Sequence, residues 1–205
     1  MIVGLLRHGR TAWNDAGRMQ GRADVPLSAA GRVQVRNWRL PPVLADARVV
    51  SSPLARATET AALFGDPHVV DALVEMDWGA WEGATIASLS ADHTVAFAAA
   101  SSLGPQFRPP GGETPDEVRQ RVTAWLVAAA RKRPGQPLLA VTHQGVIRAL
   151  LAGITGWNMA GRPPVRLADD VVHIIEVDPA GPLRAIEWNV PLIDGPVGRR
   201  RTDPL

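Results

Sequence analysis

The 205-residue sequence contains no cysteine, no tyrosine and a single lysine, Lys132. The absence of cysteine excludes disulfides, thiolate catalysis and cysteine-ligated zinc. No uninterrupted apolar stretch approaches the ~20 residues that a membrane-spanning helix needs. Residues 1–6 lack a basic leading segment and a small-residue cleavage site, so we expect no signal peptide. These features predict a cytoplasmic protein that is not associated with a membrane.

Only one of the 22 basic residues is lysine, so the other 21 are arginines, and the chain also contains 20 acidic residues. A formal net charge of +2 gives no reason to expect nucleic-acid binding. The guanidinium of arginine has a planar fork that matches the oxygens of a phosphate group. Hydrophobic residues make up 46% of the chain, which is enough for one folded domain with a substantial core.

Short apolar runs alternate with helix-like segments along the chain. Strands are expected at residues 2–6, 48–51, 68–70, 138–142, 171–177 and 183–188. Helices are expected at residues 28–40, 53–64, 95–100, 115–132 and 146–151. This alternation predicts an α/β fold, a three-layer sandwich with a mostly parallel central sheet flanked by helices. Sites in such folds lie beyond the carboxyl ends of the strands.

The sequence shows no internal repeat and no long linker. We expect a single domain over residues 1–194, with an irregular cap region at about 84–112. Residues 195–205 contain three consecutive arginines and are expected to be a disordered basic tail without a nucleic-acid role.

Two of the five histidines directly follow predicted buried strands. His8 comes after the strand at 2–6, and His143 comes after the strand at 138–142. Both are expected at the same sheet edge, where Gly9 and Gly145 allow the chain to turn sharply. The helix that begins near 145 presents free N–H groups, which form a ready anion site. The remaining three, His68, His93 and His173, are expected to be structural.

Two arginines accompany these histidines. Arg7 adjoins His8, and Arg56 lies one turn into the helix that follows the strand at 48–51. Guanidinium groups beside imidazoles form a cationic pocket that suits a phosphate monoester. The same cations disfavour imidazolium and so keep a histidine neutral and nucleophilic. A leaving alcohol also needs a general acid, for which Glu75 is the candidate.

Residues 6–14, Leu-Arg-His-Gly-Arg-Thr-Ala-Trp-Asn, resemble the signature of the histidine phosphatase superfamily, the phosphoglycerate-mutase-like group. Further segments match this family in order, at residues 19–28, 52–61, 75–83, 111–114 and 141–145. The matches span roughly residues 2–150. The resemblance implies a phosphoglycerate-mutase-like fold and a metal-independent phosphatase that needs no cofactor.

The resemblance also implies a role for each matching residue. His8 would be the nucleophile that takes the phosphoryl group, and Glu75 would protonate the leaving oxygen and then activate water. Arg7, Arg56 and His143 would surround the phosphate and stabilise its transition state.

Further phosphate contacts are implied from Asn14 and from the backbone N–H of Gln144, with Gln20 and Gly21 at the pocket rim. Glu82 lies close to Glu75 in sequence, but in the phosphatase branch the acid precedes the aromatic-Gly segment by a few residues, which selects Glu75. This sequence departs from the family at Arg10, where an acidic residue is usual. Arg10 is either a solvated surface residue or a contact for a second anionic group.

The resemblance leaves alternatives open. A phosphoglycerate-type mutase would use the same nucleophile, but such mutases resemble longer chains with a basic insert, and residues 83–112 contain only Arg108 as a base. A catalytically inert phospho-ligand binding module would be expected to lack one of the catalytic residues. We therefore predict hydrolysis of a small-molecule phosphate monoester. A broad phosphatase role, α-ribazole phosphate and sugar phosphates all remain open, as does a homodimer.

Overall fold

The structure is a computed structural model that describes residues 1–92 and 103–192. Its centre is a six-stranded sheet with the order β3-β2-β4-β1-β5-β6. The strands are β1 (Ile2–Arg7), β2 (Arg48–Ser51), β3 (His68–Val69), β4 (Leu138–Thr142), β5 (Val171–Val177) and β6 (Leu183–Pro191). The first four strands in this order are parallel, whereas β5 and β6 run antiparallel to their neighbours. The prediction of a mostly parallel sheet is confirmed.

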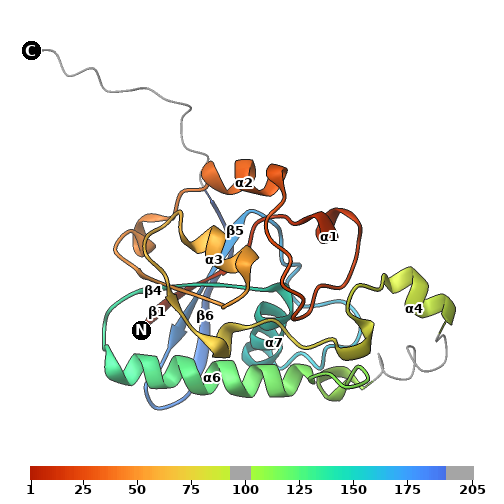
Figure 1. Cartoon of the computed structure of the whole chain (residues 1–205). Coiled ribbons are helices and arrows are strands. Elements are labelled where there is room, and N and C mark those ends of the chain that lie inside the picture. The colour runs from red at the N-terminus through yellow and green to blue at the C-terminus, as the bar shows by residue number, and fades with distance from the viewer. Residues whose placement is uncertain (93–102, 193–205) are drawn as a thin grey trace, which may run out of the picture.

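Helices cover both faces of the sheet, as Figure 1 shows. The helices α6 (Pro115–Lys132) and α7 (Gln144–Thr155) pack on one face, and α2 (Ala29–Arg36) and α3 (Ala55–Ala61) pack on the other. Two further helices, α1 (Ala12–Asp15) and α4 (Ile86–Asp92), lie outside these layers. Short 3-10 turns occur at Pro42–Leu44, Asp71–Leu73, Gly79–Trp81 and Gly104–Gln106.

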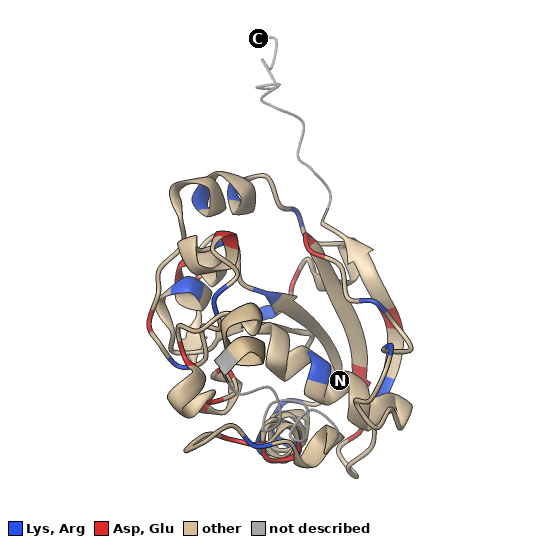
Figure 2. Ribbon diagram, turned by 90° about the vertical axis from the view of Figure 1, so that its right-hand side faces the viewer, with Lys and Arg blue, Asp and Glu red and all other residues tan. Residues whose placement is uncertain are grey.

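The strand periodicity divides the core into two clusters. In β1, Val3 and Leu5 pack toward α6 and α7, whereas Leu6 packs toward α2 and α3. Successive side chains of a strand point to opposite faces, so a strand buried on both sides must be apolar throughout. The central strands in Figure 2 are accordingly almost free of charged residues. Charge is found at the strand ends, as at Arg7.

Three helices differ from the prediction in where they begin or end. Helix α2 ends at Arg36 rather than near residue 40. Helix α3 begins at Ala55, because Leu54 is extended and acts as the N-cap. Helix α7 starts at Gln144 and continues through Gly153 to Thr155, where Gly156 ends it in the left-handed conformation at φ 72°. The predicted helix at 95–100, His93 and the predicted tail at 195–205 lie outside the described residues.

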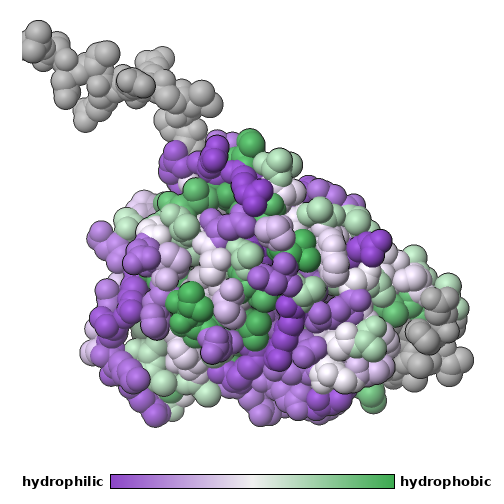
Figure 3. Space-filling model, in the orientation of Figure 1, coloured by the Kyte–Doolittle hydropathy of each residue, from purple (hydrophilic) through white to green (hydrophobic). Residues whose placement is uncertain are grey.

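Within the described ranges, no helix has both the length and the apolar character that a bilayer span requires. The face shown in Figure 3 mixes hydrophilic and hydrophobic residues.

Candidate active site

The two histidines predicted at strand ends lie side by side. Strands β1 and β4 are adjacent and parallel. Their last residues, Arg7 and Thr142, are paired, so the two strands end side by side at the same edge of the sheet. The backbone N–H of His8 continues the pairing by donating to the carbonyl of Thr142 at 3.0 Å. The ring centroids of His8 and His143 are 5.1 Å apart, and both rings are buried.

The hydrogen bond at His8 determines which ring nitrogen is free. His8 Nδ1 lies 2.7 Å from the carbonyl oxygen of Gly9. A carbonyl only accepts, so Nδ1 carries the proton and the neutral ring keeps its lone pair on Nε2. Burial lowers the pKa of His8 well below its ordinary value, and the charges of Arg56 and Arg7 lower it further. His8 is therefore a neutral imidazole with an available nucleophilic nitrogen.

His143 is the N-cap of α7 and is fully buried. Its Nε2 lies 2.7 Å from the Ser52 hydroxyl at the end of β2. Its Nδ1 is buried and has no hydrogen-bond partner among the described residues. An unpartnered buried polar atom is costly, and this one belongs to a ring that packs against His8.

Arg56 is held rigidly from the opposite side. Its side chain is fully buried, with Nη1 donating to the carbonyl of Ala23 at 2.8 Å and Nη2 donating to that of Gly21 at 2.7 Å. The carboxylate of Glu82 holds this loop by accepting from the N–H groups of Arg22 and Ala23. Glu82 thus fixes the loop that positions Arg56, and it does not line the cavity.

Glu75 is a buried carboxyl group at the N-terminus of α7. Its oxygens accept from the backbone N–H of Gly145 at 3.1 Å and from that of Met76 at 2.7 Å. Burial raises the pKa of Glu75, although these two hydrogen bonds and the charge of Arg56 work against the rise. A Cβ at residue 145 would lie 2.4 Å from Glu75 Oε1, so only glycine leaves room for the carboxyl group.

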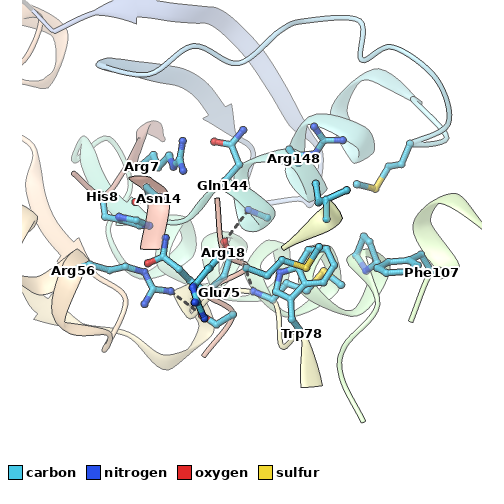
Figure 4. Close-up of a pocket in the computed structure, with 18 of the residues that line it drawn as sticks. Arg7, His8, Asn14, Arg18, Arg56, Glu75, Trp78, Phe107, Gln144 and Arg148 are labelled. Carbon is cyan, nitrogen blue, oxygen red and sulfur yellow. Dashed lines mark hydrogen bonds between the residues drawn. The ribbon is translucent and has the colours of Figure 1, made fainter. Parts of the chain in front are cut away.

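Most of these groups line one cavity of about 380 Å³. The cavity is lined by every predicted phosphate-site residue except His143, namely Arg7, His8, Asn14, Gln20, Gly21, Arg56, Glu75 and Gln144. Figure 4 shows Arg7, His8, Asn14 and Arg56 gathered at one end of it. Arg7 Nη1 is paired with Asp169 at 2.6 Å in this state.

The family model described as "Histidine phosphatase superfamily (branch 1)" matches residues 3–190. The chain belongs to this superfamily. It is 33% identical over 179 residues to a metal-independent phosphoserine phosphatase of Arabidopsis thaliana, covering 83% of this chain and 75% of that protein. It is 34% identical over 178 residues to a glucosyl-3-phosphoglycerate phosphatase of Mycobacterium tuberculosis, covering 78% of this chain and 77% of that protein.

Longer relatives also occur in this superfamily. The bifunctional protein Rv2228c of Mycobacterium tuberculosis is 32% identical over 187 residues, but the match spans only 47% of that protein. Among solved structures, mycobacterial glucosyl-3-phosphoglycerate phosphatase Rv2419c in complex with VO3 has a TM-score of 0.76 and 29% identity. That match covers 92% of this chain and 98% of that one.

Most residues at the far end of the cavity in this histidine phosphatase were not identified from the sequence. Figure 4 shows Trp78 and Phe107 there, with Arg148 on the wall formed by α7. The cavity residues that sequence reasoning missed are Arg18, Met19, Met76, Ile86, Gly104, Phe107, Pro115, Gly145, Arg148 and Met159. A signal existed for Arg148, because it lies four residues after Gln144 on the same face of a helix.

Two further residues can be placed. Arg10 is exposed and binds Asp15, with its Nε 3.1 Å from the carboxylate, which agrees with the solvated-surface interpretation. His173 is buried in β5, where its Nδ1 accepts from the N–H of Asn189 at 3.1 Å. The described residues contain no group of three or more His, Asp or Glu side chains arranged to hold a metal ion.

Proposed function

We propose that this chain hydrolyses small phosphate monoesters through a phosphohistidine at His8. One observation carries the proposal: the bond from His8 Nδ1 to the Gly9 carbonyl leaves Nε2 as a lone-pair nucleophile in the same cavity as Arg7, Arg56 and Glu75. The names of the relatives support it, since two of them are phosphatases of small phosphorylated metabolites.

In the first step, the Nε2 lone pair of His8 attacks phosphorus and forms an N–P bond. The P–O bond to the alcohol breaks, and Glu75 gives its proton to the departing oxygen. Arg7 and Arg56 face the negative charge of the phosphoryl oxygens, where preorganised cations are most effective. The unpartnered Nδ1 of His143 would donate a further hydrogen bond, while Nε2 of the neutral ring accepts from the Ser52 hydroxyl.

Asn14 and Gln144 complete the proposed phosphate site. The side-chain oxygen of Asn14 accepts from the N–H of Thr11 at 2.9 Å, which leaves its NH₂ group available to a phosphate oxygen. Gln144 is the first residue of α7, so its backbone N–H has no partner within the helix. Gln20 and Gly21 are proposed to form the rim.

In the second step, water attacks phosphorus, and the carboxylate of Glu75 takes the proton from that water. The N–P bond breaks, His8 Nε2 recovers its lone pair, and inorganic phosphate leaves. Each turnover therefore returns both residues to their starting protonation states.

The two pKa shifts make this pair of protonation states compatible. In water, a histidine is neutral above about pH 6.5 and a glutamic acid is protonated below about pH 4.3, so the two forms hardly coexist. Here burial lowers the pKa of His8 and raises that of Glu75, and both shifts favour the combination of a neutral His8 with a protonated Glu75.

We include residues 1–194 in one catalytic domain, with the segment at about 84–112 as a cap, because Ile86, Gly104 and Phe107 line the cavity.

The hydrogen bonds of Arg108 favour hydrolysis over a mutase reaction. Arg108 is exposed and donates to Gly112 and Glu117, so it is not available to bind a second phosphate group, as a mutase would require.

The test is His8→Ala assayed with p-nitrophenyl phosphate. We expect kcat to fall by a factor on the order of 10⁴ or more. Wild-type protein mixed with ³²P-labelled substrate should carry an acid-labile, base-stable label that His8→Ala lacks. A chelator should leave wild-type activity unchanged.

The matched control is His68→Ala, which removes an exposed histidine on β3. It should keep wild-type activity and labelling. Full activity in the His8→Ala protein would overturn the mechanism.

A further inference from the structure

A second cavity lies at the opposite end of the sheet from the candidate active site. Its volume is about 330 Å³, and it is found where α6 ends, near the N-terminus of the chain (Figure 1). Strand β4 runs from Leu138 at this cavity to Thr142, which His143 follows directly. An extended chain rises about 3.3 Å per residue, so roughly 16 Å separate Leu138 from His143. The second cavity shares no lining residue with the first.

Three basic residues from two separate segments line this second cavity. Arg48 is the first residue of β2, whereas Lys132 is the last residue of α6 and Arg133 is its C-cap. The backbone N–H of Arg48 donates to the carbonyl of Pro137 at 3.0 Å, which holds the start of β2 against the segment that follows α6. The fold therefore brings three positive charges to one cavity.

These three charges have no acidic counterpart among the described residues. Neither Asp nor Glu lines the cavity, and none of the ion pairs in the described ranges includes Arg48, Lys132 or Arg133. The negative end of a helix dipole favours basic residues, which accounts for the two at the end of α6. It does not account for Arg48, which lies on a strand. Like charges that converge in this way favour the binding of an anion.

The rest of the cavity wall is largely apolar. Val50 and Leu138 are buried there, and Trp125 on α6 is partly buried against the core. Trp125, Ala129 and Lys132 are spaced by four and three residues, so the indole and the ammonium group lie on the same side of α6. An aromatic face beside basic side chains is the combination that binds a flat ring joined to a phosphate.

We propose that the cavity formed by Arg48, Trp125, Lys132 and Arg133 binds an organic phosphate with a flat aromatic ring, of the size of a nucleoside monophosphate. The basic side chains bind the phosphate oxygens, and the ring stacks on the indole. A volume of about 330 Å³ is near the lower end of the ~300–1,000 Å³ range of small-molecule sites, which suits a single nucleotide. This site uses no residue of the proposed phosphatase mechanism and is independent of it.

The experiment measures the binding of adenosine 5′-monophosphate by isothermal titration calorimetry. The His8→Ala protein is used throughout, so that the proposed phosphatase activity does not consume the probe. Adding Arg48→Gln or Lys132→Gln should raise the Kd by roughly 10- to 100-fold, because each change removes a charged hydrogen-bond donor. The Tm of each variant verifies folding, since substitutions at the surface change stability little.

Arg131→Gln is the matched control. Arg131 precedes Lys132 on α6 but does not line the cavity, and its Nε donates to the carbonyl of Pro179 at 2.7 Å. This variant loses the same charge and should keep the original Kd. The proposal is overturned if Arg48→Gln and Lys132→Gln leave the Kd unchanged, as they would if the nucleotide occupied only the phosphatase site. It is also overturned if Arg131→Gln weakens binding equally, because net charge alone would then explain the effect.

A ligand series tests the two halves of the proposed site. Ribose 5-phosphate lacks the base, and adenosine lacks the phosphate. In the binding event that Arg48→Gln weakens, each should bind roughly 10- to 100-fold more weakly than adenosine 5′-monophosphate. Equal affinity for ribose 5-phosphate would show that Trp125 contributes no stacking and would overturn the assignment of an aromatic ligand.

Discussion

Two glutamates seven residues apart have different surroundings and different uses. Glu75 is buried against the first turn of α7, where burial raises its pKa. Glu82 accepts two backbone N–H bonds from the loop that holds Arg56. One carboxyl group therefore lies where a proton can be held and released, and the other fixes a loop. The sequence-based choice of Glu75 over Glu82 as the candidate acid fits this geometry.

The role of Glu75 as an acid predicts a dependence on the leaving group. Glu75→Gln should lower kcat/KM for an alkyl phosphate by roughly 10²- to 10³-fold, because an alkoxide cannot leave without a proton. The loss should be much smaller with p-nitrophenyl phosphate, whose phenolate leaves unaided. The measurement is the ratio of kcat/KM for the two esters, and an equal loss on both would contradict the assignment.

His8, His143 and Arg56 were predictable because each follows a strand or lies in the first turn of the helix after one. Asn14, Gln20 and Gly21 were expected only from the resemblance to the family. Which ring nitrogen of His8 is free could not be predicted from the sequence. It depends on the backbone carbonyl of Gly9, and only the fold places that carbonyl next to Nδ1. The hydrogen-bond partners of Arg56 could not be predicted either, because Gly21 and Ala23 lie over 30 positions from it in the sequence.

At the scale of elements, α7 organises the site. His143 caps it, Gln144 and Gly145 form its first turn, and Arg148 follows one turn later. The positive end of the helix dipole therefore faces the cavity, as suits a helix that binds an anion.

Gly145 gives a test in which stability and activity move in different directions. Alanine in a helix is about 1 kcal/mol more favourable than glycine, so Gly145→Ala should not lower Tm. Its Cβ would displace the Glu75 carboxyl group, and an error of about 1 Å in a catalytic group can cost on the order of 10²-fold in rate. Measuring Tm and kcat on the same sample separates the two effects.

Gly153→Ala is the matched control, since its Cβ would meet the flexible side chain of Arg119 instead. It should keep wild-type kcat. Wild-type activity in Gly145→Ala would show that Glu75 is not held as the structure indicates.

Sequence reasoning located these elements better than it located their ends. The capping box at Thr114 fixed the start of α6, because side chain and backbone bond reciprocally there. Pro53 misled the prediction for α3, whose first turn begins two residues later. Gly153 misled the prediction for α7, because glycine in a packed helix need not end it, whereas Gly156 adopts a positive φ and does.

At the scale of the whole molecule, the sheet order decides which residues meet. Strands β1 and β4 are over 130 residues apart in sequence and adjacent in the sheet, so His8 and His143 come together. The alternation of strands and helices in the sequence predicts that both histidines lie at the carboxyl edge of the sheet. Most of the far wall of the cavity could not be predicted, because it is assembled from loop and helix residues such as Ile86, Phe107 and Met159 that share no periodicity.

The whole fold should also lose stability in acid through its buried histidines. Burial lowers the pKa of His173 to about 4, and its Nδ1 accepts from Asn189, a bond that protonation would break. Between about pH 6.5 and 4 the unfolded chain binds a proton at His173 that the folded chain does not. The free energy of unfolding should therefore fall between about pH 6.5 and 4, by up to ~3 kcal/mol from this residue.

Urea denaturation across that pH range tests the prediction. His173→Gln, which cannot titrate, should show a shallower fall than wild-type protein. His68→Gln, at an exposed position, should follow the wild-type curve. Parallel curves for His173→Gln and wild-type protein would contradict it.

The ion pair between Arg7 and Asp169 bears on the end of the reaction cycle. Asp169 is exposed, and its carboxylate lies 2.6 Å from Nη1 of Arg7. On the proposed mechanism, Asp169 competes with the phosphoryl oxygens for this guanidinium. Such competition would weaken the binding of the inorganic phosphate product to Arg7 and so favour its release.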